Sequence, residues 1–424
     1  MYLQNRKQII RLLTNKYMKF WFTILFISAL PVALLSQVKD PFLDGRAEMK
    51  KEHYNEAIGT FTSGLSSNNV SADLLLNLGQ CFYQVNDYNS AIHYLLLADN
   101  MKKNLGSYWL AKSYAMAGKN DSAIIYLKAN LSSAYKLPES TIKLDPAFND
   151  LENTRLWKDL WSQEWYDDFE NLLAEINYLT RKNEYVEILD LIDQNLAKYA
   201  QKHQIYAARG KVFLDLKNFN SAVTAYSRAI EISGTHPEYY IDRAKAYSSL
   251  QKYDLAVSDL IKALNLEPDN FPLYVERGRL YNNLSKFNMA LDDISYYMTF
   301  FPEDIQAMYL NGQIYYDQGS YLKALEWFNK CLSIDQSEAN FYIARGNTYL
   351  RTNTYKFALQ DYGMALDLDP KNPDTYLSKG LARYQLNDAE GACNDWQKAA
   401  RLGSAKAIEM LNTRCQNLKK NGRL

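Results

Sequence analysis

Few residues of this chain have the types and spacings that catalysis or metal binding needs. The sequence contains no G-x-S-x-G, no P-loop and no glycine-rich strand-to-helix turn. None of its histidines lies in H-E-x-x-H or a comparable metal spacing; they are His53, His93, His203 and His236. We therefore predict that the protein is not an enzyme and binds no metal and no cofactor.

Charged residues, by contrast, recur at a regular spacing. Basic residues stand at Arg209, Arg243, Arg277, Arg345 and Lys379, and for the last four an aspartate follows 16 residues later, at Asp259, Asp293, Asp361 and Asp395. Where Asn311 replaces the basic residue, Trp327 replaces the aspartate, and Arg209 is followed by Ala225. Because the opposite charges appear and disappear together in all but the first of these units, the pattern predicts ion pairs between neighbouring helices, each of little effect on stability if exposed.

These charges belong to a longer repeat that organises residues 203–402. A small residue falls every 34 residues, at Gly210, Ala244, Gly278, Gly312, Gly346 and Gly380. An alanine follows the same step, at Ala222, Ala256, Ala290, Ala324, Ala358 and Ala392. A fixed period of this length indicates stacked copies of one supersecondary unit.

Residues 271–304 show what one unit contains. Tyr274, Gly278 and Tyr281 lie at helical spacing on one face. A second such face follows after a polar turn at 282–286, and Pro302 ends it. The unit is therefore an antiparallel helix pair in which Gly278 lets the two backbones approach. A bulky residue there would overpack the contact at a cost of about 1–3 kcal/mol.

The pattern resembles the tetratricopeptide repeat, whose signature is a bulky residue, Leu-Gly, Tyr, then Ala, Phe and Pro over about 34 residues. The unit that begins at Ala339 matches it at Tyr342, Gly346, Tyr349, Ala358, Tyr362, Ala365 and Pro370. Arg or Lys replaces the family's leucine in most units. The resemblance implies an all-α fold, a right-handed superhelical solenoid of tetratricopeptide helix pairs. It is specific for the fold and weak for function.

The rest of the chain is arranged around this regular array of six units at 203–402. Residues 37–137 carry about three further units, and residues 138–168 interrupt the period as a helical insert. Residues 169–202 form a degenerate unit in which Ile176 stands at the glycine position, so its two helices should approach less closely. Residues 403–424 form a C-terminal cap helix and tail.

Residues 1–36 have the pattern of an export segment. Basic residues among the first 17 precede an apolar run from Phe20 to Leu35, and Ser36 follows it. This indicates a secretory signal peptide, with Met18 as a more compact start, or an uncleaved N-terminal anchor. Either places residues 37–424 outside the cytoplasm, in the periplasm or cell envelope or secreted. The protein would touch a membrane only through that uncleaved segment.

The insert carries three tryptophans, Trp157, Trp161 and Trp165, at a spacing that predicts one face of a helix. One interpretation is an exposed aromatic ridge that docks a partner. The other is that the helix packs on the array and the tryptophans belong to the core. The segment also resembles insert helices beside tetratricopeptide arrays in bacterial envelope proteins, which favours packing.

In the tetratricopeptide family the concave surface is lined mainly by the first helix of each unit. Carried over by position, this gives one row at Lys211, Lys245, Arg279, Gln313 and Asn347, beside a mainly apolar row that contains Tyr309. Three consecutive basic residues beside an apolar row suit an acidic and hydrophobic peptide. The alternative is an ordinary solvated charged face.

Cysteine usage allows one disulfide. Cys393 lies on the second helix of the last unit and Cys415 near the end of the cap helix, so antiparallel neighbours could join them in an oxidising compartment. The stretch around them also resembles a recurrent ending of secreted Bacteroidetes-type tetratricopeptide proteins. The alternative is two buried thiols. Cys81 and Cys331 are far apart in the array and are expected in the core.

Charge and resemblance together favour one function. The chain has 48 basic and 48 acidic residues, which argues against a nucleic-acid partner. We expect a non-enzymatic, exported scaffold that binds a partner protein or peptide along its concave surface. Two alternatives stay open: an envelope assembly or secretion accessory factor, and a regulatory, non-catalytic partner of an enzyme.

Overall fold

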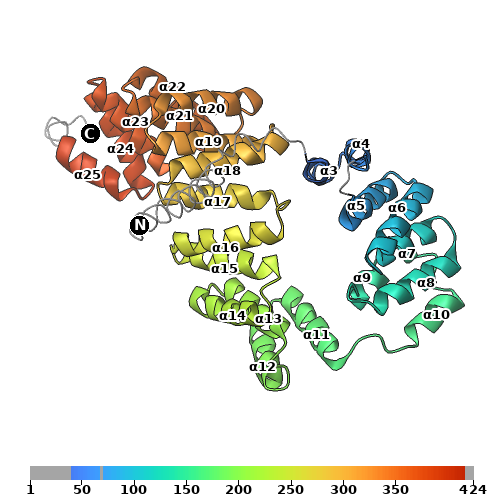
Figure 1. Ribbon diagram of the computed structural model, residues 1–424. Helices are drawn as coiled ribbons and strands as arrows, with labels where there is room; N and C mark the ends of the chain where they lie inside the picture. Colours follow the sequence, from blue (N-terminus) through green and yellow to red (C-terminus); the bar gives the residue numbers. More distant parts are fainter. Residues whose placement is uncertain (1–39, 67–69, 416–424) are drawn as a thin grey trace, which may run out of the picture. The chain divides into compact units, whose positions relative to one another are not determined.

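The computed structural model describes residues 40–66 and 70–415, and in these ranges it is built of α-helices, one short 3-10 helix and no strand (Figure 1). The predicted signal peptide or anchor, residues 1–36, lies outside the described residues. The chain divides into two compact units, Met1–Glu170 and Asn171–Leu424. The boundary falls within α11 (Asp168–Lys182).

The first compact unit contains three helix pairs and then the insert. The pairs are α3 (Pro41–Lys50) with α4 (Tyr54–Gly64), α5 (Ala72–Gln84) with α6 (Tyr88–Met101), and α7 (Ser107–Met116) with α8 (Asn120–Leu131). The insert consists of α9 (Glu139–Lys143), η1 (Pro146–Phe148) and α10 (Arg155–Trp161). Its buried residues join one core with those of α7 and α8, so the insert is part of the folded unit.

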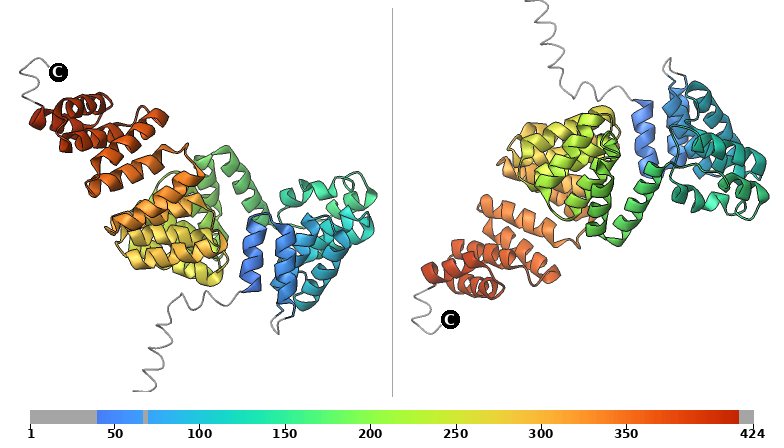
Figure 2. Two further views of the ribbon diagram at one scale, coloured as in Figure 1. Left: turned by 90° about the horizontal axis from the view of Figure 1, so that it is seen from above. Right: turned by 90° about the horizontal axis from the view of Figure 1, so that it is seen from below.

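The second compact unit has the same kind of helix pairs as far as α25, and Figure 2 shows its helices in two further views. After α12 (Tyr185–Leu196) the pairs are α13 (His203–Asp215) with α14 (Phe219–Ile232), α15 (Pro237–Ser249) with α16 (Tyr253–Leu266), α17 (Pro272–Asn283) with α18 (Phe287–Phe300), α19 (Ile305–Asp317) with α20 (Tyr321–Ile334), α21 (Ala339–Arg351) with α22 (Tyr355–Leu368), and α23 (Pro373–Gln385) with α24 (Ala389–Arg401). The last helix, α25 (Ala405–Arg414), packs on α24.

The small residue of each unit is a point of close approach between its two helices. A Cβ atom added to Gly278 would lie 3.0 Å from Cδ1 of Ile294 and 3.3 Å from the carbonyl oxygen of Ala290. At Gly312 it would lie 2.6 Å from the ring of Phe328. A side chain at these positions therefore forces the second helix to move, which is why the sequence returns to a small residue every 34 residues.

The degenerate unit differs at this point. Ile176 occupies the position of the small residue and is buried. A hollow of about 620 Å³ lies between α11 and α12, lined largely by acidic and amide side chains. This is the wider spacing that a bulky residue at Ile176 leads one to expect.

The first helix of each pair ends in one recurring turn. In α15 the N–H of Lys252 donates to the carbonyl of Tyr247 at 2.8 Å, and that of Gln251 donates to Ser248 at 2.9 Å. Gln251 has a φ of +58°. This is the Schellman arrangement, in which a left-handed residue satisfies the last carbonyls of a helix. The same position has positive φ in the other pairs, at Glu52, Asn86, Gly118, Asn183, Lys217, Ser285, Gly319, Asn353 and Asn387.

Three of the predicted ion pairs form as expected between the two helices of a unit. Both oxygens of Asp259 accept from Arg243, at 2.8 and 2.7 Å. The corresponding bonds are 2.8 and 2.6 Å between Arg277 and Asp293, and 2.8 and 2.7 Å between Arg345 and Asp361. These pairs are not exposed, because each aspartate side chain is at most 8% accessible. Removing one partner should therefore destabilise the protein more than breaking a surface pair, because the other charge would stay buried and unpaired.

These arginines also bond the preceding unit. A further guanidinium nitrogen of Arg243 donates to Ser227 at 2.9 Å, and that of Arg345 donates to Asn329 at 2.7 Å. Ser227 and Asn329 lie 16 residues before their arginines, on the second helix of the unit before. Each of these two arginines therefore ties two neighbouring units together as well as two helices.

Two members of the predicted series behave differently. Asp395 pairs with Arg383 at 3.3 Å, not with Lys379, because Arg383 stands one turn further along α23 and has the longer reach. Arg209, expected to lack a partner, pairs at 3.0 Å with Asp193, 16 residues before it on α12. A spacing of 16 residues in the forward direction does not predict this pair, because the aspartate precedes the arginine.

Candidate functional site

Four of the six predicted groove residues line one cavity. Arg279, Tyr309, Gln313 and Asn347 surround a space of about 450 Å³ that extends over three consecutive units. We number groove positions relative to the small residue of each unit. Tyr309 is at position −3, and Arg279, Gln313 and Asn347 are at position +1 of successive units.

Three first helices position these side chains. Arg279 projects from α17, Tyr309 and Gln313 from α19 and Asn347 from α21. Positions −3 and +1 are four residues apart, so they lie one above the other on the same helix face. Stacking of units by the 34-residue repeat then places the three helices in line.

Sequence reasoning missed other residues of the cavity wall. They come from the same first helices and from one second helix: Asn282, Asn283, Leu310, Tyr316, Asp317, Phe328 and Ala344, whereas Ile343, which also lines the cavity, belongs to the predicted apolar row. Asn282 and Tyr316 stand four residues after their small residue, and Asn283 and Asp317 five. Extending the two groove positions by one helical turn would have found these four.

Tyr309 forms the apolar part of the wall. Its ring centroid lies 5.8 Å from that of Phe328 and 5.2 Å from that of Phe341. Burial raises the pKa of Tyr309, while a hydrogen bond with Gln313 lowers it, and the burial effect prevails. The hydroxyl is therefore protonated at neutral pH and available for hydrogen bonding.

The wall of the cavity contains one basic side chain, Arg279, and one acidic side chain, Asp317. Arg279 is exposed and forms no ion pair within the described part of the chain. Asp317 accepts from the amide nitrogen of Asn282 at 2.7 Å. It lies eight residues after Tyr309 on α19, about 12 Å along the helix axis. The Oδ1 atom of Asn347 accepts from Tyr362 at 2.8 Å, which leaves its NH₂ group to donate.

Lys211 and Lys245 do not line this cavity. Both are exposed on the first helices of earlier units. The ammonium of Lys245 lies 2.8 Å from Asp242, whose other oxygen accepts from the hydroxyl of Tyr226 at 3.0 Å. The predicted row of three free cations is therefore reduced, since an aspartate of the same helix neutralises its middle member.

The three tryptophans of the insert do not share one helix. The helix α10 ends at Trp161, so Trp165 lies in the following coil, where its indole N–H donates to the carbonyl of Leu160 at 2.8 Å. Trp157 is only 7% exposed and packs against Phe148. All three belong to the core that joins the insert to α7 and α8. The prediction that all three tryptophans share one helical face is thus wrong for Trp165. Trp157 is too buried to form part of an exposed ridge.

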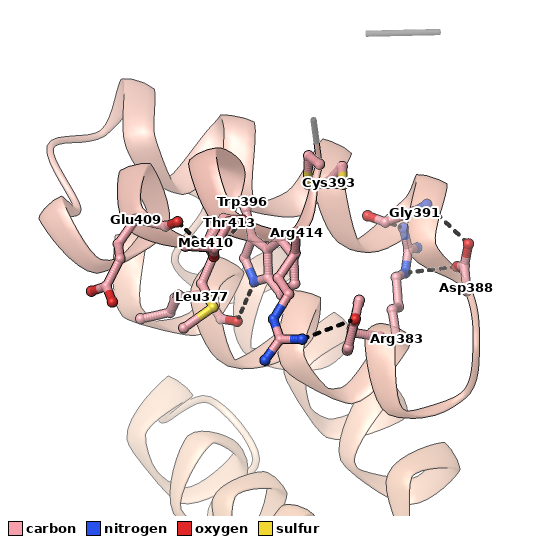
Figure 3. The surroundings of a disulfide bond; sticks show 12 residues. Leu377, Arg383, Asp388, Gly391, Cys393, Trp396, Glu409, Met410, Thr413 and Arg414 are labelled. Carbon is pink, nitrogen blue, oxygen red and sulfur yellow. Dashed lines mark hydrogen bonds and ion pairs between the residues drawn. A yellow bond between two sulfur atoms is a disulfide. The ribbon is translucent and has the colours of Figure 1, made fainter. Parts of the chain in front are cut away.

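The sulfur atoms of Cys393 and Cys415 form a disulfide, with their Cα atoms 6.0 Å apart (Figure 3). The bond attaches the end of α25 to α24 beside Trp396, which is fully buried and donates from its indole to the carbonyl of Leu377 at 3.2 Å. Both cysteines belong to the core cluster of the last unit. The cap helix therefore closes the array through a covalent bond as well as through packing.

The described residues offer no other chemical site of the kinds sought in the sequence. Among them no group of three or more His, Cys, Asp or Glu side chains is placed to hold a metal ion. Of the helices in these ranges, none combines the length and the hydrophobicity that a membrane crossing needs. Cys81 and Cys331 are buried, free thiols whose pKa values burial raises, that of Cys331 to about 11.

Comparisons with known proteins agree with the repeat. Models of the tetratricopeptide repeat match residues 42–104, 203–236 and 237–270, and a TPR repeat model matches residues 312–353. No curated protein matches the chain.

Several solved structures are similar in fold. A tetratricopeptide repeat protein from Parabacteroides merdae is 18% identical over 57% of this chain and 97% of its own, with a TM-score of 0.49. The C-terminal part of a TPR repeat-containing protein from Cytophaga hutchinsonii is 20% identical over 56% of this chain and 98% of its own, with a TM-score of 0.46. YrrB, described as a TPR protein with an unusual peptide-binding site, is 19% identical over 45% of this chain and 100% of its own, with a TM-score of 0.35.

Stacked antiparallel helix pairs with a 34-residue period define an all-α repeat solenoid. The matching models, the close approach at each small residue and the recurring turn identify the repeat. The chain is a tetratricopeptide repeat protein. Proteins of this fold act as protein–protein interaction scaffolds, generally without catalysis of their own.

Proposed function

We propose that this protein is an exported, non-enzymatic scaffold that binds a partner protein or peptide in the groove formed by α17, α19 and α21. The observation that carries the proposal is the cavity of about 450 Å³ into which Arg279, Tyr309, Gln313 and Asn347 converge. An aromatic wall with a few converging polar groups is the composition expected of a binding site.

The cavity composition suits a peptide. Amide side chains such as Gln313 and Asn347 carry both donors and acceptors and can therefore pair with a peptide backbone. Arg279 supplies a charged donor without a partner of its own in the described residues, and Tyr309 supplies an apolar surface with one hydroxyl. Such a wall favours an extended or turned peptide with one acidic residue and one apolar residue.

Export is supported by two separate features. The basic and apolar pattern of residues 1–36 is that of an export segment. The disulfide between Cys393 and Cys415 is a bond that persists in oxidising compartments and is rare in the cytosol. We infer that the folded part of the chain works in the periplasm or cell envelope, or is secreted.

Site-specific photocrosslinking in the cells that produce the protein tests the proposal. Benzoylphenylalanine would replace Tyr309 in the groove, and in a matched control it would replace Leu322, which is 76% exposed on α20. We expect one protein to be captured from position 309 and not from position 322. Equal capture from both positions, or none from position 309, would refute binding in the groove. Recovery of the unreacted protein with its signal segment intact in the cytosol would refute export.

A further inference from the structure

A tyrosine at position −3 is rare in this chain. Among the first helices of the described pairs, only α7 and α19 carry one, at Tyr108 and Tyr309. The other first helices have Phe42, Leu76, Leu173, Ala207, Ile241, Val275, Ile343 and Leu377 at this position. A hydroxyl therefore enters the groove at two places, one in each compact unit.

In the first compact unit the chain itself fills this place. The hydroxyl of Tyr108 donates to Oδ2 of Asp145 at 2.5 Å, and the ammonium of Lys112 lies 2.9 Å from the same oxygen. Lys112 is at position +1 of its unit, the position that Gln313 has in α19. The two groove positions of α7 thus hold an acidic side chain supplied by the insert.

The insert presents that acidic residue in a compact turn. The other oxygen of Asp145 accepts from the backbone N–H of Ala147 at 2.9 Å and so caps η1, which begins with Pro146. Phe148 is 1% exposed, and its ring centroid lies 6.1 Å from that of Tyr108. The sequence Asp-Pro-Ala-Phe therefore places a carboxylate and an aromatic ring against the same tyrosine.

The surroundings of Asp145 favour its ionised carboxylate. Burial alone would raise the pKa of Asp145, but hydrogen bonds from Tyr108 and Lys112 outweigh it and hold the pKa below its ordinary value. The rings of Tyr83 and Trp109 lie 4.9 and 4.7 Å from the ammonium of Lys112 and complete its surroundings. A tyrosine hydroxyl and a cation therefore bind an acidic side chain in this groove, together with the backbone N–H of Ala147 on its other oxygen.

The second compact unit has a tyrosine at the same position and a cation in the same cavity, but position +1 of its own helix is the neutral Gln313, and no described residue occupies the cavity. Tyr309 lies at position −3, the guanidinium of Arg279 supplies the cation from the preceding unit, and both line the open cavity. Tyr309 is partly exposed and offers an aromatic ring a surface to pack on, whereas Phe328 and Phe341, which contact Tyr309, are themselves buried. Asp317, about 12 Å further along α19, disfavours an acidic residue at that end and so fixes the direction of a bound segment.

We propose that this cavity binds an acidic residue that begins a turn, followed by proline and, two positions later, an aromatic residue: an Asp-Pro-x-Phe segment of a partner protein. The inference rests on the proposed groove function and specifies its ligand. The acidic side chain bonds Tyr309 and Arg279, proline favours the turn because its φ is fixed, and the aromatic ring packs beside Tyr309. The binding site thus resembles the contact that the chain makes with its own residues 145–148.

A labelled peptide of residues 143–149 with blocked ends, titrated with the full chain in fluorescence anisotropy, tests the inference. We expect saturable binding that weakens at least about tenfold when asparagine replaces the aspartate of the peptide, because a charge-assisted hydrogen bond is lost. Arg279→Ala in the protein should weaken binding by a similar factor. Lys211→Ala, at the same position of a unit without the cavity, should leave it within about twofold. Tyr309→Phe removes only the hydroxyl and tests the site independently.

Three results would overturn the inference. The peptide does not bind, its asparagine form binds as tightly as the aspartate form, or the Arg279→Ala and Tyr309→Phe proteins bind the peptide as tightly as the parent protein does. The melting temperature of each variant must match that of the parent protein. If either Arg279→Ala or Tyr309→Phe fails this control, the other variant provides the test. A partner captured from position 309 together with failure of the peptide would refute this ligand and leave the groove function intact. Failure of both experiments would refute the groove function itself.

Discussion

Replacing Arg277 by methionine tests whether the ion pairs inside the repeats stabilise the array. Both oxygens of Asp293 accept from Arg277, at 2.8 and 2.6 Å, and the two side chains are 16% and 8% exposed. The rings of Tyr274 and Tyr281 lie 5.4 and 6.0 Å from the guanidinium carbon. Methionine keeps most of the apolar packing of the arginine stem, so the change mainly removes the partner of the carboxylate.

The expected cost of Arg277→Met is about 3 kcal/mol, because breaking a buried pair leaves an uncompensated charge. This cost lies at the lower end of the range usual for breaking a buried ion pair, because the two side chains are still partly accessible to water. The double variant Arg277→Met with Asp293→Leu removes that charge as well and should lie within about 1 kcal/mol of the parent protein. The comparison therefore separates the penalty of an orphaned carboxylate from the net contribution of the pair.

Repeat arrays do not always unfold in one step, so the free energy should be measured locally. Hydrogen exchange of the backbone amides of α17 and α18 reports the opening of this unit, and urea denaturation reports the whole chain. Arg209→Met is the matched control, since Arg209 has the same position in its unit but pairs with Asp193, which is 55% exposed. It should cost less than about 1 kcal/mol.

Acidification provides a second test with a defined sign. Burial raises the pKa of Asp293 above its ordinary value, against the lowering effect of Arg277. Without Arg277 the pKa rises further, and a folded state with a raised carboxyl pKa gains stability as the pH falls. The cost of Arg277→Met should therefore shrink between pH 7 and pH 5. Equal losses in the single and double variants, or a cost independent of pH, would refute the reasoning.

Three further predictions concern single positions. Gln251→Gly should stabilise the protein by about 1 kcal/mol in urea denaturation, because glycine adopts the left-handed turn without the steric cost that glutamine has there. Gly346→Ala should destabilise the protein by about 1–3 kcal/mol in the same assay, since the added methyl group would lie 2.9 Å from a tyrosine ring of α22. In the control Gly363→Ala, the methyl group meets no atom within 4 Å, so this variant should be more stable by about 0.5–1 kcal/mol. The ring of His203 packs against that of His236 at a tilt, with ring centroids 4.5 Å apart, and burial and that neighbour lower the pKa of His203. The unfolded chain then binds a proton more readily than the folded chain, so the melting temperature should fall below about pH 6.5, and His203→Asn should weaken this dependence.

The regular part of the fold could be predicted from the sequence because its period reports a packing constraint. Each small residue marks a place where two helices approach within contact of a ring or a carbonyl, as at Gly278 and Gly312. The same logic found the pairs of Arg243, Arg277 and Arg345, since a fixed separation along two antiparallel helices gives a fixed geometry. Periodicity thus determines what every copy shares.

Features that occur once in the chain could not be predicted in this way. The end of α10 at Trp161 follows from the fold of the insert, for which the chain offers no second copy. Asp395 bonds Arg383 because a longer side chain one turn away reaches it, which spacing alone does not reveal. The seat of Asp145 on Tyr108 joins residues 37 positions apart that belong to different kinds of segment, so no repeat connects them.

The unit of α19 and α20 shows how the copies can be compared within one chain. On the packing side, Asn311 and Trp327 replace the Arg and Asp of neighbouring units, and Oδ1 of Asn311 is buried without a hydrogen-bond partner in the structure. On the groove side, Tyr309 and Gln313 depart from the apolar and basic residues of preceding units, and the cavity opens there. A position that has the same kind of residue in most units contributes to the packing of the array. The unit of α19 and α20 departs from the other units on both its packing side and its groove side, so its residues at these positions are not explained by that packing. The cavity lies at this unit, so the departures from the repeat, more than the repeat itself, coincide with the site at which we propose that a partner binds.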